Sequence, residues 1–320
     1  MLMSCHDLPR RTFLKSALAT TLSAAATELG VELARAVEAA GDIPMRTLGR
    51  TGLAVTMIGI GGYHAGLPEK EEESTRIIHR ALDLGINFFD NADCYQGGRA
   101  EERMGKALQG RREKIILMTK VDQRDAKGSR EQLEKSLRRL RTDYLDIWQF
   151  HGVATRDDLE KIFGRGGAME AAELARKQGK IRFVGFTGHF DPSVHLAFLK
   201  HHPFDTLQMP INVVDPHFRS FRGVVLDEAV RRNTGVIAMK TLSFGNILSK
   251  GVAKTPEALG WVWSQPISVL CSGCDTIERL DYNVYLAKTF KPMPESEQAV
   301  LLERTKYHAG TGVEDYKRQA

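Results

Sequence analysis

The feature that most constrains the fold is a repeated alternation of short apolar segments and longer amphipathic segments between residues 45 and 290. The short segments, such as KIILMTK, are apolar along their whole length, and the longer ones, such as SREQLEKSLRRL, carry apolar residues at helical spacing. Strands that are apolar throughout are typical of a parallel sheet with helices on one side and a packed interior on the other. Eight such strand–helix units predict an α/β protein with the (β/α)8 TIM-barrel fold.

The main alternative is an open doubly wound sheet, which normally carries a glycine-rich fingerprint after its first strand. The glycines of GIGGYHAG at residues 59–66 do not fit G-x-G-x-x-G, so the closed barrel is preferred. Before the barrel, MRTLGRTGLAV has a Gly-Arg-Thr-Gly break between two short segments, which predicts a β-hairpin. After it, residues 291–320 predict a C-terminal helix followed by a polar tail.

Residues 1–40 differ in kind from the rest of the chain. Residues 9–15 read PRRTFLK and precede a stretch of small residues, a pattern that resembles a twin-arginine export signal. The segment Ala34-Arg35-Ala36 offers small residues for cleavage. This pattern predicts a targeting segment that is read by the twin-arginine export machinery, and therefore an exported or periplasmic protein. The alternative is an ordinary alanine-rich helix on a cytoplasmic protein.

Composition excludes several classes of protein. The 45 basic and 40 acidic residues give a net charge of only +5 and are spread along the chain, so nucleic-acid binding is not expected. No run of 18 apolar residues occurs, so no membrane-spanning helix is expected. The pair Cys271 and Cys274 forms C-x-x-C without the second ligand pair of a zinc ribbon, so no metal site is predicted. We interpret this pair as part of a loop, and a disulfide between the two stays open for an exported protein.

Chemically active side chains follow three successive predicted strands. In a barrel of this kind the active site lies at the carboxyl ends of the strands. Asp90 ends the apolar run of NFFD, and Tyr95 follows in the next loop. Lys120 ends KIILMTK, and His151 ends YLDIWQFH. The sequence therefore predicts that these four residues meet at one mouth of the barrel.

This set of side chains suits the reduction of a carbonyl group. A free phenol has a pKa near 10, and a nearby buried ammonium group favours the phenolate and lowers that pKa. The ammonium group needs a counter-ion, which Asp90 can supply, and His151 can orient a substrate oxygen. A tuned proton donor that faces a polarised carbonyl is what reduction by hydride from a cofactor requires.

The motif Asp-x-Ala-x-x-Tyr, followed by the strand-end Lys and His, resembles the aldo-keto reductase family. The resemblance extends from Met45 to about Ala287 and includes GINFFDNADCYQGGRAEERMGKAL and YLDIWQFHG. It implies a small-molecule aldehyde or ketone substrate and a nicotinamide cofactor. It also implies a role for each catalytic residue: Tyr95 as proton donor, Lys120 as pKa modulator, Asp90 as its ion partner and His151 as orienting group.

The resemblance also implies a cofactor site. The family usually has Ser-Asn after the fifth strand, where this chain has Thr187 and Gly188, so Thr187 keeps the hydroxyl and the Asn is missing. Gln208 matches the carboxamide-binding Gln of the sixth strand. After the seventh strand, Met239 replaces an aromatic residue that stacks on the nicotinamide, and Lys240 can reach a cofactor phosphate.

The last strand and its helix match the adenosine end of the family's cofactor site at Gly273, Arg279 and Asn283. A guanidinium pairs bidentately with phosphate oxygens, so Arg279 is the natural partner of a 2′-phosphate. This favours NADP(H) over NAD(H).

Two further interpretations of the same barrel remain. The barrel could hold its cofactor as a redox sensor or regulatory subunit with little turnover, or Lys120 could form a Schiff base as in an aldolase. Around Tyr95, the sequence predicts that Asp93 is a solvated loop acid and that Cys94 points away from the site. His189, at the mouth beside the cofactor loop, is left open as a ligand contact.

Overall fold

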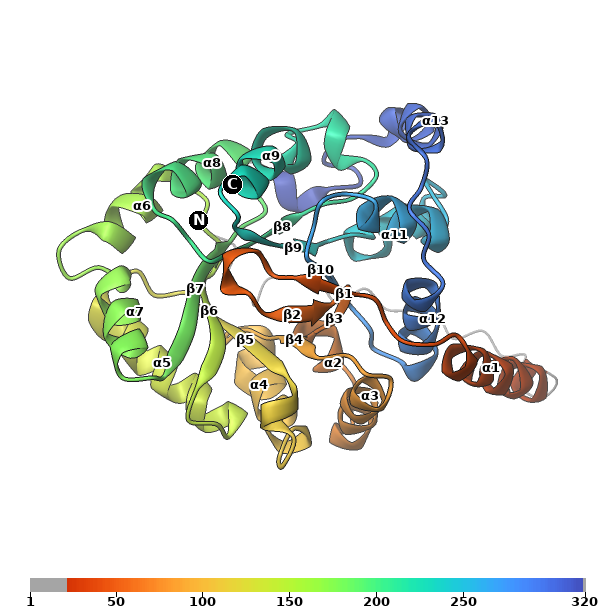
Figure 1. The fold of residues 1–320 in the computed structure, drawn as a ribbon, viewed down its shortest axis with the longest axis horizontal. Coiled ribbons are helices and arrows are strands. Elements are labelled where there is room, and N and C mark those ends of the chain that lie inside the picture. The colour runs from red at the N-terminus through yellow and green to blue at the C-terminus, as the bar shows by residue number, and fades with distance from the viewer. Residues whose placement is uncertain (1–21, 319–320) are drawn as a thin grey trace.

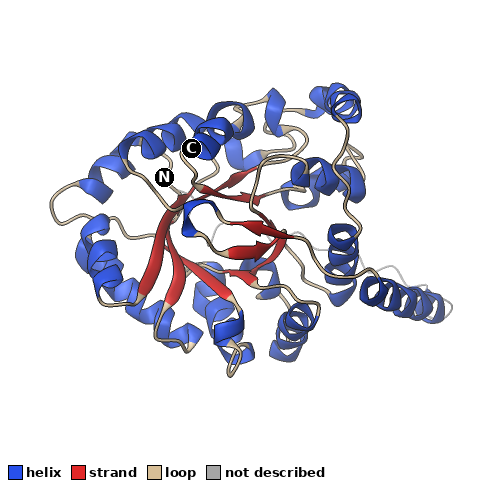
Figure 2. Cartoon of the chain, in the orientation of Figure 1, coloured by secondary structure: helices blue, strands red, loops and turns tan. Residues whose placement is uncertain are grey.

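The computed structural model describes residues 22–318 and shows a closed barrel of eight parallel strands with helices around it (Figures 1 and 2). The predicted (β/α)8 barrel is therefore confirmed. Each strand pairs with its neighbours along the chain, and the last strand pairs with the first to close the ring. The strands are β3 (Ile58–Gly61), β4 (Phe88–Asp90), β5 (Ile116–Val121), β6 (Leu145–Phe150), β7 (Ile181–Thr187), β8 (Thr206–Pro210), β9 (Gly235–Met239) and β10 (Val269–Ser272).

The interior of the barrel is filled by every second residue of its strands. Side chains alternate across a strand, so residues two apart share a face. On β5, Ile116 and Met118 belong to the interior cluster, whereas Leu117 and Val121 pack against the helices. Lys120 lies on the same face as Ile116 and Met118 and therefore points into the barrel. The same alternation makes side chains near the carboxyl ends of other strands point into the barrel. Polar side chains at that end therefore lie above the apolar interior cluster.

The predicted hairpin is confirmed and covers the amino-terminal end of the barrel. Strands β1 (Met45–Thr47) and β2 (Ala54–Thr56) pair antiparallel, and Figure 1 shows them across the barrel. Leu48 is fully buried in the interior cluster. Gly235 leaves room for it, since a Cβ there would meet Leu48 side-chain atoms at 2.8 Å. The hairpin thus closes the end of the barrel opposite the strand carboxyl ends.

Helices form the outer layer (Figure 2). Several begin at side-chain caps, as where Asp125 accepts a hydrogen bond from the Gly128 amide. The segment before α9 is a π-helical turn over Arg222–Leu226, so the helical layer is partly irregular after β8. The helices are α2 (Gly62–Ala65), α3 (Glu71–Asp83), α4 (Arg99–Ala107), α5 (Ala126–Leu140), α6 (Arg156–Phe163), α7 (Ala168–Lys177), α8 (Pro192–His201), α9 (Asp227–Arg231), α10 (Asn246–Ser249), α11 (Thr255–Trp263), α12 (Ile277–Lys288) and α13 (Glu295–Thr305).

The predicted targeting segment overlaps a helix, α1 (Leu22–Ala39), beside α12 (Figure 1). The Val37 side chain is buried, and Lys288 donates to the Val37 carbonyl at 2.9 Å. Glu38 pairs with Arg80 on α3 at 3.1 Å. The small residues proposed for cleavage lie within this helix, and the twin arginine lies outside the described residues. None of the helices in residues 22–318 is long and apolar enough to cross a membrane.

The segment expected as a polar tail is docked by buried charges. The Lys317 ammonium lies 2.7 Å from Asp215 and 2.9 Å from Glu314, and all three side chains are fully buried. Lys317 also donates to the Phe218 carbonyl at 2.8 Å. Asp215 belongs to the loop after β8, so this group ties the tail to the carboxyl-end mouth of the barrel.

Removing the cation should expose how much this group stabilises the fold. Lys317→Met leaves two carboxylates buried without a counter-ion, which should lower the free energy of unfolding by about 3–5 kcal/mol. The measurement is urea unfolding. The matched control is Arg318→Met, because Arg318 is exposed and its replacement should change stability by less than about 0.5 kcal/mol. Equal stability of the two variants would contradict the role given to Lys317.

Candidate active site

Lys120 is the centre of the polar group at the mouth. Its side chain is 1 % exposed and forms an ion pair with Asp90 at the end of β4. The ammonium also donates to the Asn91 carbonyl at 2.7 Å and contacts the Tyr95 hydroxyl at 3.2 Å. Three of the four predicted catalytic residues therefore meet through one ammonium group.

Asp90 is held on its other side by two donors from distant strands. Gln208 on β8 donates to Asp90 Oδ2 at 3.1 Å, and the Cys271 thiol on β10 does so at 3.2 Å. Burial and the Asp90 charge raise the pKa of the Cys271 thiol, so it stays protonated and can donate. We interpreted Cys271 as a loop residue, but it lies within β10 and faces the interior. Its place two residues after the inward-facing Val269 was the signal that could have found it.

Tyr95 carries a proton in this environment. Burial raises the pKa of Tyr95 to about 12, and the nearby Lys120 charge opposes this without outweighing it. The sequence led us to expect a net decrease, which was wrong. The reason is that Asp90 neutralises much of the Lys120 charge at the phenol, while burial disfavours the phenolate. The ion pair itself raises the pKa of Lys120 although burial lowers it.

His151 lies against Tyr95 and is oriented by an acid. The two rings are 5.8 Å apart, nearly perpendicular. His151 Nδ1 lies 2.9 Å from Asp122 Oδ1 and 3.5 Å from Cys94 Sγ. Because Nδ1 is engaged in this way, Nε2 is the ring nitrogen that can reach a substrate oxygen. Asp122 was not predicted, and Cys94 contacts the site although we expected it to point away.

Asp93 is also more than a solvated acid, contrary to our expectation. Its carboxylate accepts hydrogen bonds of 2.6 Å from Arg139 and 2.6 Å from Gln132, both on α5. It therefore ties the loop that carries Tyr95 to a helix of the outer layer.

The predicted nicotinamide contacts lie at the ends of β7 and β9 and in the middle of β8. Thr187 is buried at the end of β7, and Met239 ends β9. Gln208 uses its amide nitrogen on Asp90, while its oxygen is buried without a hydrogen-bond partner among the described residues. An orphaned acceptor of this kind fits the amide group of a nicotinamide carboxamide. Lys240 lies 3.8 Å from the Phe244 ring centroid, and burial lowers its pKa to about 7.

The predicted adenosine contacts gather after β10. A Cβ at Gly273 would lie 2.4 Å from His64, so the glycine allows the two segments to approach. Arg279 is 63 % exposed and pairs through one nitrogen with Asp275 at 2.6 Å. Asn283 donates to Ser272 at 3.0 Å, so its amide is engaged within the chain. Cys271 and Cys274 are both free thiols, and the disulfide left open from the sequence is not formed.

Aromatic rings form a nearly continuous wall around the mouth. Tyr63 lies 5.4 Å from Tyr95 and 5.3 Å from His64, measured between ring centroids. Tyr316 of the tail lies 6.5 Å from Phe244 and 5.8 Å from His189. The sequence could not reveal this wall because its rings come from separate segments. It gives the mouth an apolar lining suited to a flat ligand.

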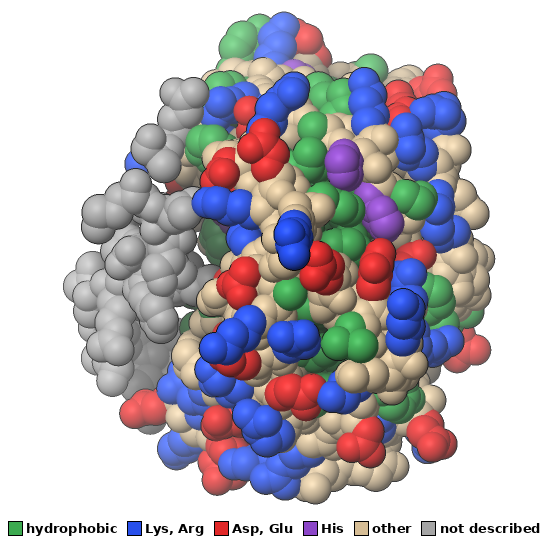
Figure 3. Space-filling view, turned by 90° about the vertical axis from the view of Figure 1, so that its left-hand side faces the viewer, with side chains coloured by type: hydrophobic (Ala, Val, Ile, Leu, Met, Phe, Trp, Pro, Cys, Tyr) green, Lys and Arg blue, Asp and Glu red, His purple; other side chains and the backbone are tan. Residues whose placement is uncertain are grey.

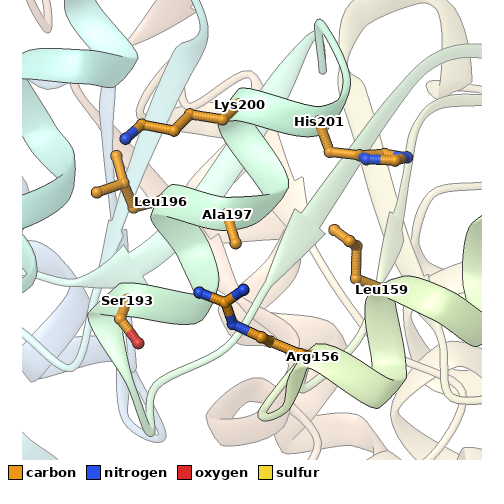
Figure 4. A pocket seen from close by; sticks show the side chains of 7 residues that line it. All are labelled: Arg156, Leu159, Ser193, Leu196, Ala197, Lys200 and His201. Carbon is orange, nitrogen blue, oxygen red and sulfur yellow. The ribbon is translucent and has the colours of Figure 1, made fainter.

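Outside the barrel, a surface cleft of about 470 Å³ lies between α6 and α8 (Figure 4). None of the predicted site residues lines it, and its polar groups do not form a catalytic set. On the face seen in Figure 3, basic and acidic side chains are interspersed. The barrel mouth therefore remains the candidate active site. The cleft is lined by Arg156, Leu159, Ser193, Leu196, Ala197, Lys200 and His201.

Comparison with known proteins identifies the family of this barrel. Residues 57–266 match a family model, and this match together with the closed barrel defines an oxidoreductase of the (β/α)8 type. The chain belongs to the aldo/keto reductase family. The resemblance recognised from the motifs around Asp90 and Tyr95 is thereby confirmed at the level of the family.

Relatives cover most of the chain. It is 27% identical over 267 residues to the "Uncharacterized oxidoreductase YqkF" of Bacillus subtilis, which covers 80% of this chain and 76% of that protein. It is 28% identical over 271 residues to the "6-dehydroglucose reductase" of Novosphingobium aromaticivorans. This alignment covers 72% of this chain and 86% of that protein. The holo form of an aldo-keto reductase from Bacillus halodurans superposes with a TM-score of 0.73 at 25% identity, covering 86% of this chain and all of that one.

Proposed function

We propose that this protein reduces the carbonyl group of a small aldehyde or ketone to an alcohol, with Tyr95 as the proton donor. The observation that carries the proposal is the single Lys120 ammonium group that contacts both the Asp90 carboxylate and the Tyr95 hydroxyl. Family membership supports the reaction class, and the relative named "6-dehydroglucose reductase" supports a carbonyl compound as substrate.

The proposed mechanism follows from the protonation states of these groups. A nicotinamide cofactor, when bound, supplies the hydride for the carbonyl carbon. Tyr95, with its pKa of about 12, holds its proton at neutral pH and can give it to the carbonyl oxygen. The alkoxide that forms is a much stronger base than a phenolate, so this transfer is downhill. Lys120 then stabilises the phenolate, and His151 holds the substrate oxygen through Nε2.

The cofactor proposal rests on side chains that can still form hydrogen bonds or ion pairs with a nicotinamide cofactor. The orphaned Gln208 oxygen and the buried Thr187 hydroxyl suit the carboxamide, and Lys240 suits a phosphate. The Arg279 guanidinium is exposed, and Asp275 occupies only part of it. An available guanidinium at the adenosine end supports NADP(H) over NAD(H).

The two other interpretations, an aldolase and a redox sensor, require different properties of Lys120 and Tyr95. A Schiff base needs a neutral amine, but the Asp90 ion pair raises the pKa of Lys120 even though burial lowers it. This argues against aldolase chemistry. A cofactor-binding redox sensor needs no proton donor, whereas Tyr95 is held against the ammonium group. The distinction between sensor and enzyme is a matter of turnover.

Tyr95→Phe should separate these interpretations. It removes the acidic proton and keeps the ring, so the turnover of aldehydes and ketones with NADPH should fall by about 10²–10⁴-fold. The matched control is Tyr63→Phe, which alters a neighbouring phenol 5.4 Å away and should leave most activity. Equal rates for wild type and Tyr95→Phe would refute the catalytic assignment. Cofactor binding without turnover of any carbonyl in a broad panel would favour the sensor.

Cofactor preference should depend on Arg279. Arg279→Met removes the proposed partner of the 2′-phosphate. KM for NADPH should therefore rise by about tenfold or more, because a charge-assisted hydrogen bond is lost. KM for NADH is the internal control and should not change. The measurement is steady-state kinetics with both cofactors. A parallel rise of both KM values would show that Arg279 does not select the phosphate.

We also propose that residues 1–40 direct export through the twin-arginine machinery, ahead of a barrel at residues 45–290 and a C-terminal segment at 291–320. The support is the PRRTFLK pattern at residues 9–15. This route is understood to move folded proteins, which would allow a cofactor bound in the cytoplasm to travel with the barrel.

The export proposal predicts that the arginine pair controls location. Arg10→Lys together with Arg11→Lys keeps the charge and removes the twin arginine, so the protein should accumulate in the cytoplasm. Cell fractionation with immunodetection measures this. An unchanged distribution would contradict export by this route and leave the cytoplasmic alternative.

A further inference from the structure

The loop that carries Tyr95 has a left-handed backbone over three residues, of which Gln96 is the one that is not glycine. Gln96, Gly97 and Gly98 follow Tyr95 with φ values of 47°, 65° and 97°. Left-handed conformations are uncommon for residues other than glycine and persist only where surrounding contacts enforce them. The position of the Tyr95 hydroxyl therefore depends on groups outside the loop.

Arg139, on the last turn of α5, supplies these contacts. Its NH1 group donates to Asp93 Oδ1 at 2.6 Å and lies 3.4 Å from the Asp93 carbonyl, two residues before Tyr95. The same nitrogen lies 3.3 Å from Glu101 Oε2. Glu101 is fully buried, and Arg139 is 25 % exposed. One guanidinium group is thus shared by two carboxylates, one on each side of the loop.

The far end of this connection reaches the strand that carries Lys120. The Thr119 hydroxyl donates to Glu101 Oε1 at 2.7 Å, and Thr119 is the outward-facing neighbour of Lys120 on β5. Arg139 therefore links the Tyr95 loop to the Lys120 strand through Asp93 on one side and Glu101 on the other.

The loop also packs directly on the guanidinium group. A Cβ at Gly98 would lie 2.2 Å from Arg139 Cζ, so only glycine allows the backbone to approach this closely. Gln132, two turns earlier on α5, donates to the second Asp93 oxygen at 2.6 Å. The turn after Tyr95 therefore packs on the carboxyl-terminal part of α5.

We propose that Arg139 is a positioning residue for the reaction: it sets the distance between the Tyr95 hydroxyl and the Lys120 ammonium group through Asp93 and Glu101. The proposal rests on the proposed function, since it concerns the efficiency of proton donation by Tyr95. It does not make Arg139 a catalytic residue, because Arg139 contacts neither Tyr95 nor Lys120 in any hydrogen bond of the described structure.

The test is a double-mutant cycle on the rate of single-turnover carbonyl reduction by the full-length protein with NADPH. Arg139→Met should lower the rate on the order of 10–100-fold, the effect of a misplaced catalytic group, with the cofactor Kd unchanged. In a Tyr95→Phe background the same change should have little further effect, because the group that Arg139 positions is already gone. Arg138→Met, on the exposed side of the same turn, is the matched control.

A merely structural ion pair would give a different pattern. If Arg139→Met lowers the rate equally in the wild-type and Tyr95→Phe backgrounds, the positioning role is overturned and the proposed function stands. If Tyr95→Phe alone has no effect, the proposed function itself fails.

A conservative variant keeps the test decisive if Arg139→Met does not fold. Arg139→Lys retains a cation near the carboxylates but lacks the planar guanidinium group on which the Gly98 backbone packs. It should unfold at the same urea concentration as Arg138→Met and still show a reduced rate that disappears in the Tyr95→Phe background. A wild-type rate for Arg139→Lys would overturn the proposal.

Discussion

The ion pair between Lys120 and Asp90 is the interaction on which the rest of the mouth depends. An unpaired charge inside a protein is strongly unfavourable, so each group requires the other once the barrel closes. Their strands are adjacent, and the parity of β4 and β5 turns both side chains inward. Every other contact builds on this pair: Gln208 and Cys271 complete the carboxylate, and the Asn91 carbonyl and Tyr95 hydroxyl surround the ammonium group. Membership of the aldo/keto reductase family is consistent with a chemistry centred on this pair.

The barrel, the hairpin and the strand-end residues could be predicted because each depends on local sequence. Apolar runs and helical spacing identify the units, and a polar residue at the carboxyl end of a strand faces the mouth when it shares the parity of the interior residues. Asp90, Lys120 and Tyr95 were found in this way. The pKa of Tyr95 was not, because its direction depends on a balance between burial and two opposed charges that only the packed structure contains.

The residues that sequence reasoning missed share a different property: their roles depend on partners far away along the chain. Cys271 acts on Asp90, Arg139 acts on Asp93, and Tyr316 closes the aromatic wall. None belongs to a motif with its partner, and each looked ordinary in its own segment. The alternation of side chains along β10 would have predicted that Cys271 faces the interior. The contact between α5 and the Tyr95 loop could be recognised only from the three-dimensional structure. The residues that support this site are therefore harder to predict from the sequence than the catalytic residues that they support.

The docked tail has a consequence for how the protein is made. Tyr316 accepts a hydrogen bond from Asn212, and these residues are 104 positions apart in the chain. Such distant contacts form slowly, because the intervening chain must be ordered first. Residues 313–317 also leave the ribosome after all eight strands, so the barrel can close while its mouth is still open on one side. A nascent chain would thus form the complete barrel before Tyr316 completes the aromatic wall, and a ligand that enters during synthesis would meet a wider opening than one that arrives later.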